Sequence, residues 1–346
     1  MYDRKLVQHL QAHGDEVEII SQPGSEYWRH LRHNFSRGLL SRLENADFDI
    51  LLQDELNHPS LFMLNRRLRP TISYPILSIV HHLRSSEDHP PFLLPLYRWV
   101  ERRYLTSVDG FVCNSKTTKQ SVLKLAGKEG SFSDGSFLVA SPAGDRFQPP
   151  ITREEITARC RESGPLQILF VGNLIPRKGL HILLQALSQL PPEEWLLDVV
   201  GDTAVSPAYT NRLHLQIKQA GLKDRITFQG LLSDEQLAKQ YRRSHLLIVP
   251  SQYEGFGIVY LEGMGFGLPA IGSTAGAAGE IIRDGRNGYL IREGATAVLA
   301  QRVWHLINNR DELAGLSWNA RRTYLDWPGW EDSMAQVRAF LHRRTF

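Results

Sequence analysis

The chain has 346 residues, of which 42% are hydrophobic and 22% charged, and its formal net charge is +3. Such a composition is typical of a globular protein of about two domains, and a charge balance this close to neutral argues against a nucleic-acid-binding protein. No apolar run approaches the roughly 20 residues that span a bilayer, and the first residues lack the apolar core of a signal peptide. Because the two cysteines, Cys113 and Cys160, have no metal-site or disulfide spacing, we expect reduced thiols in a soluble, cytoplasmic protein.

Short apolar segments alternate with amphipathic helical patterns along the whole chain. The predicted strands are 15–20, 49–53, 75–81, 110–115, 136–140, 167–172, 196–201, 226–230, 245–251, 269–273 and 288–291. Continuous apolar strands separated by helices indicate parallel sheets covered on both faces. Because the strands fall into two sets, we predict an α/β protein with two facing, doubly wound, Rossmann-like domains.

A polar segment marked by proline and glycine, 141–165, separates the two sets of strands. We therefore expect a first domain over residues 1–147, a linker over 148–165 and a second domain over 166–327. The chain ends in a turn and a helix, about 328–346, which we expect to pack back on the first domain.

The loop after the strand predicted at 167–172 carries two cations, Arg177 and Lys178, directly before a helix that begins near Gly179. Ligands of open α/β sheets bind at the carboxyl ends of the strands, and cations beside a helix N-terminus suit a pyrophosphate. The same pair would also be ordinary in a solvated loop, so this pattern alone leaves both interpretations open.

Two glutamates follow the strand predicted at 245–251. Glu254 lies in a turn, and Glu262 lies in a helix that begins at about Ile258. The glycines between them let the backbone approach a ligand closely, and a carboxylate is a good acceptor for vicinal hydroxyls such as those of ribose or a hexose. The structural alternative makes Glu262 a solvated helix residue and Glu254 a partner of the helix dipole.

Together these motifs resemble the retaining GT-B glycosyltransferases of family 4. The resemblance rests on "VGNLIPRKGLHILLQAL", "ITFQGLLSDEQLAKQYRRSHLLIVPSQYEGFGIVYLEGMGFGLPAIGS" and "GEIIRDGRNGYLI", which cover most of residues 167–291. It implies transfer of a sugar from a UDP- or GDP-linked donor to a hydroxyl of a glycan or lipid-linked acceptor. It calls for no metal ion and no bound cofactor, and it assigns the donor mainly to the second domain.

The resemblance also implies roles for individual residues. Lys178 would contact the donor phosphates, Glu254 would lie near the hydroxyls of the transferred sugar, and Glu262 would bind the ribose. Backbone N–H groups would face the donor at five positions: Gly255, Phe256 and Gly257 near the sugar, and Ile258 and Val259 near the diphosphate.

The chain departs from the family pattern in two places. The family commonly has an arginine directly after the glycine that ends the strand, where this chain has Asn173, and Arg177 would then supply the charge to the donor. Family members also open with a strand and a Gly-Gly loop, whereas this chain opens within the helix that follows. We therefore expect the first domain to lack its first strand.

In the first half, "YPILSIVHHLRSSE" (74–87) is similar to the family's strand that ends in a histidine of the cleft, and His81 is the better match. The resemblance implies that His81 contacts the reacting sugar near the attacking hydroxyl. The alternative is a surface pair formed by His81 and His82, in a chain that has 13 histidines.

The segment 28–43 carries four arginines and no acid. Its apolar residues could share one face: Trp28, Leu31, Phe35, Leu39, Leu40 and Leu43. A basic amphipathic segment can lie on an anionic membrane, here the inner face, which would make the protein peripheral. The alternative is an ordinary surface helix packed on its own domain.

Two weaker patterns are rejected. The Asp-x-Asp at 47–49 lacks the context of metal-dependent GT-A enzymes, and 255–260 lacks the third glycine and the acidic ribose ligand of a dinucleotide fingerprint. Two rivals remain: a non-catalytic relative that acts as a partner subunit, and a GT-B nucleotide-sugar epimerase. The sequence predicts a metal-independent retaining glycosyltransferase with Glu254, His81 and Lys178 in catalytic positions.

Overall fold

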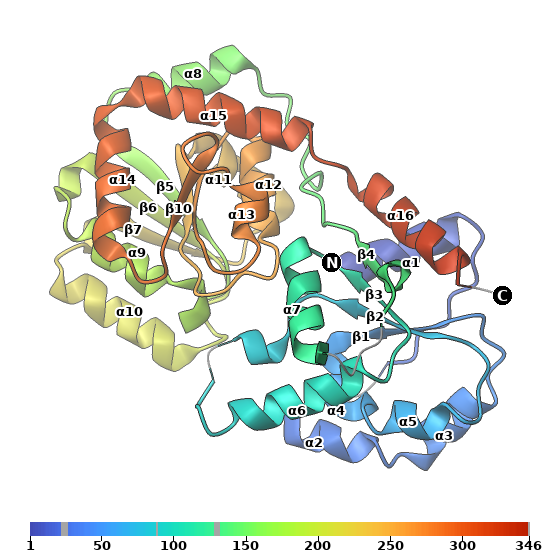
Figure 1. Cartoon of the computed structure of the whole chain (residues 1–346). Helices are drawn as coiled ribbons and strands as arrows, with labels where there is room; N and C mark the ends of the chain where they lie inside the picture. The colour runs from blue at the N-terminus through green and yellow to red at the C-terminus, as the bar shows by residue number, and fades with distance from the viewer. Residues whose placement is uncertain (22–26, 88, 128–131, 345–346) are drawn as a thin grey trace. The chain divides into compact units, whose positions relative to one another are not determined.

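The computed structural model describes residues 1–21, 27–87, 89–127 and 132–344. Its contacts divide the chain into two compact units. Unit 1 comprises Met1–Pro142 and Pro328–Phe346, and unit 2 comprises Ala143–Trp327. Each unit has its own parallel sheet (Figure 1).

Unit 1 contains a four-stranded parallel sheet in the order β1-β2-β3-β4. Its strands are β1 (Leu51–Asp54), β2 (Ile76–Val80), β3 (Gly110–Cys113) and β4 (Phe137–Val139). Its described helices are α1 (Tyr2–Ala12), α2 (Tyr27–His33), α3 (Arg37–Glu44), α4 (His58–Leu61), α5 (Leu64–Leu68), α6 (Leu94–Leu105), α7 (Lys116–Ala126) and α16 (Trp330–His342). Every residue of the central strands β2 and β3 is buried, as expected of strands covered on both faces.

The first and last helices of the chain, α1 and α16, pack on each other in unit 1. Tyr2 lies edge-on to Trp330 with ring centres 5.7 Å apart, and Arg338 Nε donates to Asp15 Oδ2 at 2.6 Å. The Ser333 hydroxyl donates to the carbonyl of Ser141 at 2.7 Å. The last helix thus completes the unit in which the chain begins.

Residues 15–20, which the sequence predicts as a strand, form no regular element. The Asp15 carboxylate is bound by Arg338 and His342 of α16, and Glu18 pairs with Arg42. Asp15 and Glu18 therefore meet cations on neighbouring helices instead of alternating along a sheet edge. The strand prediction is wrong because it rested on the apolar residues of this segment and took no account of the acids between them.

The basic segment 28–43 is divided between α2 and α3. Ser36 separates the two helices, because its hydroxyl accepts a hydrogen bond from the Leu39 N–H at 3.3 Å and caps α3. The predicted common apolar face is therefore wrong: Leu43 is buried in the core, whereas Trp28 and Phe35 are exposed.

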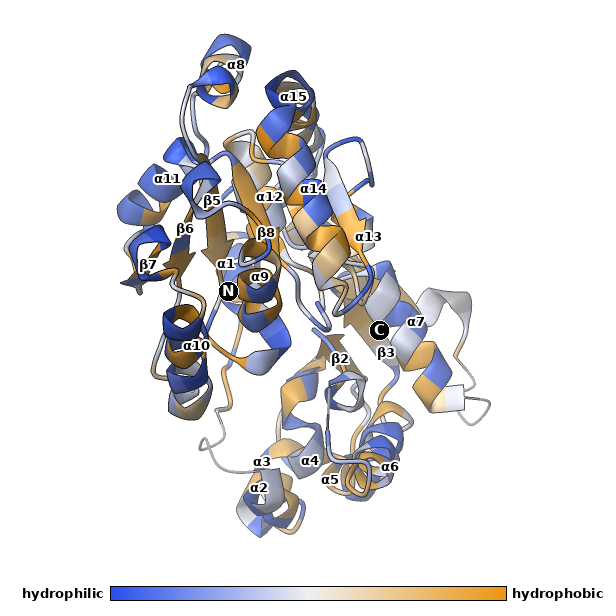
Figure 2. Ribbon diagram, turned by 90° about the vertical axis from the view of Figure 1, so that its left-hand side faces the viewer, coloured by the Kyte–Doolittle hydropathy of each residue, from blue (hydrophilic) through white to orange (hydrophobic). Residues whose placement is uncertain are grey.

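Unit 2 contains a six-stranded parallel sheet in the order β10-β9-β8-β5-β6-β7. Its strands are β5 (Leu166–Val171), β6 (Trp195–Val200), β7 (Ile226–Gly230), β8 (Leu246–Val249), β9 (Ala270–Ser273) and β10 (Gly288–Ile291). Its helices are α8 (Arg153–Arg161), α9 (Leu180–Leu187), α10 (Pro207–Gln219), α11 (Asp234–Arg243), α12 (Ile258–Gly265), α13 (Ala278–Ile281), α14 (Thr296–Asn308) and α15 (Arg310–Leu325). Figure 2 shows hydrophobic strands between helices with hydrophilic outer faces.

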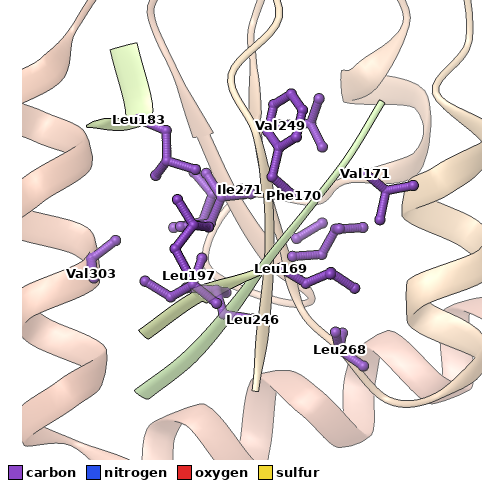
Figure 3. Close-up of a cluster of buried hydrophobic side chains, with 14 of the residues drawn as sticks. Leu169, Phe170, Val171, Leu183, Leu197, Leu246, Val249, Leu268, Ile271 and Val303 are labelled. Carbon is purple, nitrogen blue, oxygen red and sulfur yellow. The ribbon is translucent and has the colours of Figure 1, made fainter. Parts of the chain in front are cut away.

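The strand order of unit 2 reverses between β5 and β8. The chain winds from β5 through β6 to β7, returns to β8 beside β5, and then winds the other way through β9 to β10. Figure 3 shows the core at this centre, where Phe170 of β5 and Val249 of β8 lie near Ile271 of β9. In doubly wound sheets, ligands bind beyond the strand ends at such a reversal.

The segment 148–165, expected as a linker, contains the helix α8. Thr152 and Glu155 form a reciprocal capping box, with N–H to side-chain oxygen distances of 2.7 and 3.2 Å. The helix buries Ile156 and Cys160, one turn apart, and packs on α15 within unit 2. The many charges of α8 mask this narrow apolar stripe in the sequence.

Unit 1 buries two carboxyl groups beside a histidine. Glu55 Oε1 lies 3.0 Å from His58 Nδ1, but the imidazole donates its hydrogen bond to the Glu55 carbonyl, and no described residue donates one to Oε1. Glu101 accepts from the Ser85 N–H at 3.2 and 3.3 Å. Burial raises the pKa of Glu55 to about 8 and that of Glu101 to about 7, and it lowers the pKa of His58 to about 4.

We predict that unit 1 loses stability as the pH rises. A carboxyl whose folded-state pKa is raised contributes stability below its ordinary pKa, and this contribution is lost as the pH rises through the folded-state value. For Glu55 the window runs from about pH 4.5 to about pH 8. Denaturant unfolding at pH 5 and pH 9 should show a loss on the order of 2–5 kcal/mol that Glu55→Gln reduces.

The exposed Glu193 in unit 2 offers the matched control. Glu193→Gln should leave the pH dependence of unfolding unchanged. Equal losses of stability in the wild type and in Glu55→Gln would contradict the assignment of this dependence to Glu55.

Candidate functional site

The strand reversal of unit 2 brings Lys178 against Glu254. Lys178 ends a 3₁₀ turn, Pro176–Lys178, that follows β5, and Glu254 lies in the turn that follows β8. Because β5 and β8 are neighbours, the segments that follow them meet. Lys178 Nζ donates to Glu254 Oε1 at 3.0 Å and to Oε2 at 2.9 Å. The sequence predicts both residues at one site, but not their direct pairing.

Burial and charge act against each other on Glu254, whose side chain is 11% exposed. Burial alone would raise the pKa of this carboxyl, but the Lys178 ammonium and the hydrogen bonds from Lys178 and Ser251 outweigh it, so the pKa lies below its ordinary value. The Ser251 hydroxyl donates to Glu254 Oε2 at 2.9 Å. The carboxylate is therefore ionised at neutral pH, and an anionic ligand at Lys178 would compete with it for the ammonium.

Arg177 ties the same two segments together. Its guanidinium donates to the carbonyl of Tyr253 at 2.8 Å, and its own carbonyl accepts from the Gln252 N–H at 2.8 Å. The positive charge of Arg177 also contributes to the lowered pKa of Glu254. Two cations of one loop thus lie beside one carboxylate.

Two glycines permit the close approach of the backbone at this site. Gly179 has φ +74°, and a Cβ built there would lie 2.2 Å from the carbonyl oxygen of Pro250. Gly276 has φ +77°, and its Cβ would lie 2.2 Å from the carbonyl oxygen of Glu254, which accepts from the Ala277 N–H at 2.8 Å. Side chains at either position would push apart the segments that hold the Lys178–Glu254 pair.

Glu262 has a different environment from Glu254. It lies in α12, where its Oε2 accepts from the Tyr241 hydroxyl at 3.1 Å. Its Oε1 is buried, accepts no hydrogen bond from the described residues, and lies 3.6 Å from Arg146 Nη1. Burial raises the pKa of Glu262, and Arg146 and Tyr241 offset this only in part. Glu262 therefore offers a poorly satisfied acceptor.

The other predicted donor-binding residues lie on the same edge of the sheet or directly beside α12. Asn173 is exposed in the loop after β5. The Phe256 side chain is buried 6.1 Å from Trp327, so only its backbone can face a ligand. Ile258 and Val259 are the first residues of α12, where helix N–H groups lack partners within the helix.

His81 belongs to unit 1, directly after β2. Its Nε2 lies 3.2 Å from Asp3 Oδ1, and its carbonyl accepts from Asn114 Nδ2 at 2.8 Å. Burial alone would lower the pKa of His81, but the hydrogen bond and the charge of Asp3 raise it above its ordinary value overall. His82 pairs instead with Glu87 at 3.1 Å, so the two histidines do not act as one pair.

Three groups of side chains in unit 1 could each hold a metal ion: His9, His13 and Glu331; Asp3, Asp54 and His81; and Glu55, His58 and Glu101. In each group the candidate ligand atoms lie within 4.8 Å of one another. Within the described ranges, none of these groups includes Lys178, Glu254 or Glu262.

Sequence reasoning missed two residues of the site. Ser251 is the last residue of the strand predicted at 245–251. It could have been found by expecting a hydroxyl at a strand end to contact the residues of the turn that follows. Arg146 gave no usable signal, because 116 residues separate it from Glu262. It also pairs with Asp234 at the start of α11, which orients its guanidinium.

We predict that Gly179→Ala destabilises unit 2 by about 3 kcal/mol or more. The left-handed backbone alone would cost about 1–2 kcal/mol, and the overlap with Pro250 adds to this. Gly221 is the matched control, because it has φ +68° and no atom within 4 Å of its would-be Cβ. Denaturant unfolding of both variants measures the difference, and equal losses would contradict the close approach at Pro250.

Two family models match the chain. Glycosyl transferases group 1 matches residues 152–323, and Glycosyltransferase Family 4 matches residues 4–130. The D-inositol 3-phosphate glycosyltransferase of Xylanimonas cellulosilytica is 28% identical over 248 residues, which are 68% of this chain and 57% of that protein. The chain spans about half the length of the curated relatives it matches.

Several solved structures are similar over nearly the whole chain. The sucrose-phosphate synthase of Thermosynechococcus elongatus has a TM-score of 0.78 at 20% identity, covering 99% of this chain and 92% of that one. HepE of Anabaena, in complex with UDP, has a TM-score of 0.73 at 21% identity, covering 97% of this chain and 89% of that one. This likeness establishes a two-domain, Rossmann-like GT-B fold. Because the family matches extend over both units, the chain belongs to the family 4 type GT-B glycosyltransferases, the glycosyl transferases group 1.

Proposed function

We propose that the protein is a retaining glycosyltransferase that moves a sugar from a nucleotide-diphosphate donor to a hydroxyl of a glycan or lipid-linked acceptor. The observation that carries the proposal is the Lys178–Glu254 pair at the strand reversal of unit 2. It places a cation suited to phosphate directly beside a carboxylate suited to sugar hydroxyls. In the donor, the bond that breaks joins the sugar to the diphosphate. Glu254 would contact the sugar and Lys178 the phosphate, so the pair would contact both sides of that bond.

The leaving diphosphate gains negative charge as the bond to the sugar breaks. Lys178 and Arg177 would stabilise this charge, together with the backbone N–H groups of Ile258 and Val259 at the start of α12. On this proposal, side-chain cations and amides supply the stabilisation for which other transferases use a metal ion. Asn173, where the family commonly has arginine, would donate only neutral hydrogen bonds.

Glu254 would orient the transferred sugar once a phosphate oxygen takes over part of the Lys178 ammonium. The backbone of Gly255, Phe256 and Gly257 would line the same side of the sugar. His81 would act from unit 1, near the attacking hydroxyl. Its partner Asp3 favours the protonated imidazole and fixes the ring.

Glu262 would receive the ribose of the donor. Its buried Oε1 accepts no hydrogen bond from the described residues, and a ribose hydroxyl would satisfy it. UDP or GDP is the expected nucleotide. UDP has the support of the structurally similar HepE, which was solved with UDP and with UDP-glucose.

We predict that Glu254→Gln and Lys178→Met each lower the rate of sugar transfer at least 100-fold, because each removes a charge that the transition state needs. The measurement is nucleotide release with a panel of UDP- and GDP-sugars and candidate acceptors. Each single variant also leaves a buried charge unpaired, so Lys178→Met/Glu254→Gln should regain stability but not activity.

Glu293→Gln, at an exposed glutamate of the same unit, is the control and should keep the wild-type rate. Recovery of transfer in the double variant would show that the pair is only structural. The same assay separates the rivals. An epimerase would convert the donor with no acceptor, and a non-catalytic partner subunit would bind nucleotide without turning over any donor.

We predict that Glu262→Gln weakens the binding of the matching nucleoside diphosphate about 10- to 100-fold, because a hydrogen bond to a charged group is worth roughly 1.5–3 kcal/mol. Binding of inorganic pyrophosphate, which has no ribose, should not change. Calorimetry with UDP, GDP and pyrophosphate tests this, and equal weakening of all three would remove Glu262 from the ribose site.

A further inference from the structure

One end of unit 1 is built from α2, α3, α4, α5 and α6, which lie together in both views (Figures 1 and 2). Ring contacts join these helices. Trp28 of α2 lies 6.4 Å from Tyr97 of α6, and Phe62, after α4, lies 5.7 Å from Trp99 of α6. Three sequence segments, 27–44, 58–69 and 92–106, thus belong to one group of packed helices, here called the helical end of unit 1.

The helical end of unit 1 carries large apolar side chains that its own core does not cover. Phe92 is 78% exposed, Phe35 63%, Trp99 49% and Trp28 46%, and Met63 and Leu96 are exposed as well. Single exposed apolar residues are ordinary, but a group from neighbouring helices indicates an interaction surface.

The same three segments are strongly cationic. They contain ten arginines, no lysine and two glutamates, of which Glu101 is buried. The arginines are Arg29, Arg32, Arg37, Arg42, Arg66, Arg67, Arg69, Arg98, Arg102 and Arg103. The formal charge of these segments is therefore +8, and the rest of the chain has −5 to reach the total of +3. The positive charge of the protein is therefore concentrated in the segments where Trp28, Phe35, Phe92 and Trp99 are exposed.

Most of these cations have their charge available to a partner. Arg42 pairs with Glu18 and Arg69 with Asp109, but no carboxylate among the described residues pairs with Arg29, Arg32, Arg37, Arg66, Arg98 or Arg103. Arg103 lies over the Trp99 ring, 5.4 Å from its centre. An arginine that stacks on an exposed ring can bind a phosphate with its outer edge while its stem stays on apolar surface.

We infer that the helical end of unit 1 docks on an anionic phospholipid bilayer, with its exposed rings in the headgroup region and its arginines on lipid phosphates. Tryptophan and phenylalanine favour that boundary, and each arginine near an anionic surface adds about 1 kcal/mol. A second copy of the chain fits poorly, because a two-fold interface would bring two such positive surfaces together. Among the described helices, none has the length and apolar composition needed to cross a bilayer.

The inference deepens the proposed function and rests on it for its biological sense, because a bilayer surface is where a lipid-linked acceptor would be met. Its test needs neither donor nor turnover. Full-length protein is sedimented with vesicles of phosphatidylglycerol and phosphatidylcholine, and with vesicles of phosphatidylcholine alone. We expect binding to the anionic vesicles only, with an affinity that falls as salt is added.

Two variants separate the charges from the rings. Arg29→Gln/Arg32→Gln/Arg98→Gln should lower the vesicle affinity roughly 100-fold, since about 1 kcal/mol for each arginine is a factor of about five. Phe92→Ser/Trp99→Ser should weaken binding and reduce the blue shift of tryptophan fluorescence that insertion of Trp28 and Trp99 produces. Circular dichroism checks that both variants are folded.

Unit 2 offers matched controls at exposed positions. Arg212→Gln/Arg286→Gln/Arg302→Gln removes three arginines, and Trp304→Ser removes an exposed tryptophan. Neither should change vesicle binding. If the control triple weakens binding as much as the first triple, total charge is responsible and the assignment to the helical end of unit 1 is overturned.

Other results would also overturn the inference. These are equal binding to neutral and anionic vesicles, absence of binding to either, binding to RNA without a fluorescence shift on vesicles, and a concentration-dependent dimer that Phe92→Ser/Trp99→Ser abolishes. Nucleotide binding by calorimetry keeps the two proposals distinct. Vesicle binding without nucleotide binding would contradict the proposed function. Nucleotide binding without vesicle binding would contradict only the inference of membrane docking.

Discussion

The contact between Lys178 and Glu254 is the constraint around which unit 2 is organised. Removing two opposite charges from water is costly, and the cost is offset only when the geometry is good and the remaining hydrogen bonds are made. The fold supplies these conditions from three separate segments. The segment after β5 brings the ammonium, the turn after β8 brings the carboxylate and the Ser251 hydroxyl, and the segment at Gly276 holds the backbone of Glu254. Loss of Lys178 or of Glu254 would leave the other charge buried without its partner.

The two glutamates of the site differ in their electrostatics although eight residues separate them. Burial would raise the pKa of both, but Glu254 has an ammonium in direct contact, whereas Glu262 has a guanidinium only at 3.6 Å. Opposite shifts in neighbouring carboxyls are a recurrent sign that two groups serve different tasks. Glu254 is balanced by the Lys178 ammonium, which suits a position where an anionic ligand can take over part of that cation. Glu262 has an unsatisfied acceptor, which suits a neutral hydroxyl of a ligand.

Much of this arrangement was predictable from the sequence, because it is local. The strands before Lys178 and Glu254, the start of α12 at Ile258 and the two-sheet architecture follow from apolar runs that end in glycine-containing turns. Arg146 was not predictable as a partner of Glu262, since their contact depends on the tertiary packing of segments far apart in the chain. The error at residues 15–20 has the same origin: cations of α16, near the far end of the chain, decide the conformation of that segment.

The pairing of α1 with α16 has a consequence for how the protein is made. Unit 2 is continuous in sequence, so all its strands are available once residue 327 has been synthesised. Unit 1 starts first, yet His9 and Asp15 pair with residues of α16, and Tyr2, whose hydroxyl donates to the Ala140 carbonyl, also packs on Trp330 of that helix. Domains generally fold as units during synthesis. Unit 1 can therefore be completed only after the whole of unit 2 has been synthesised, because α16 follows residue 327 in the chain.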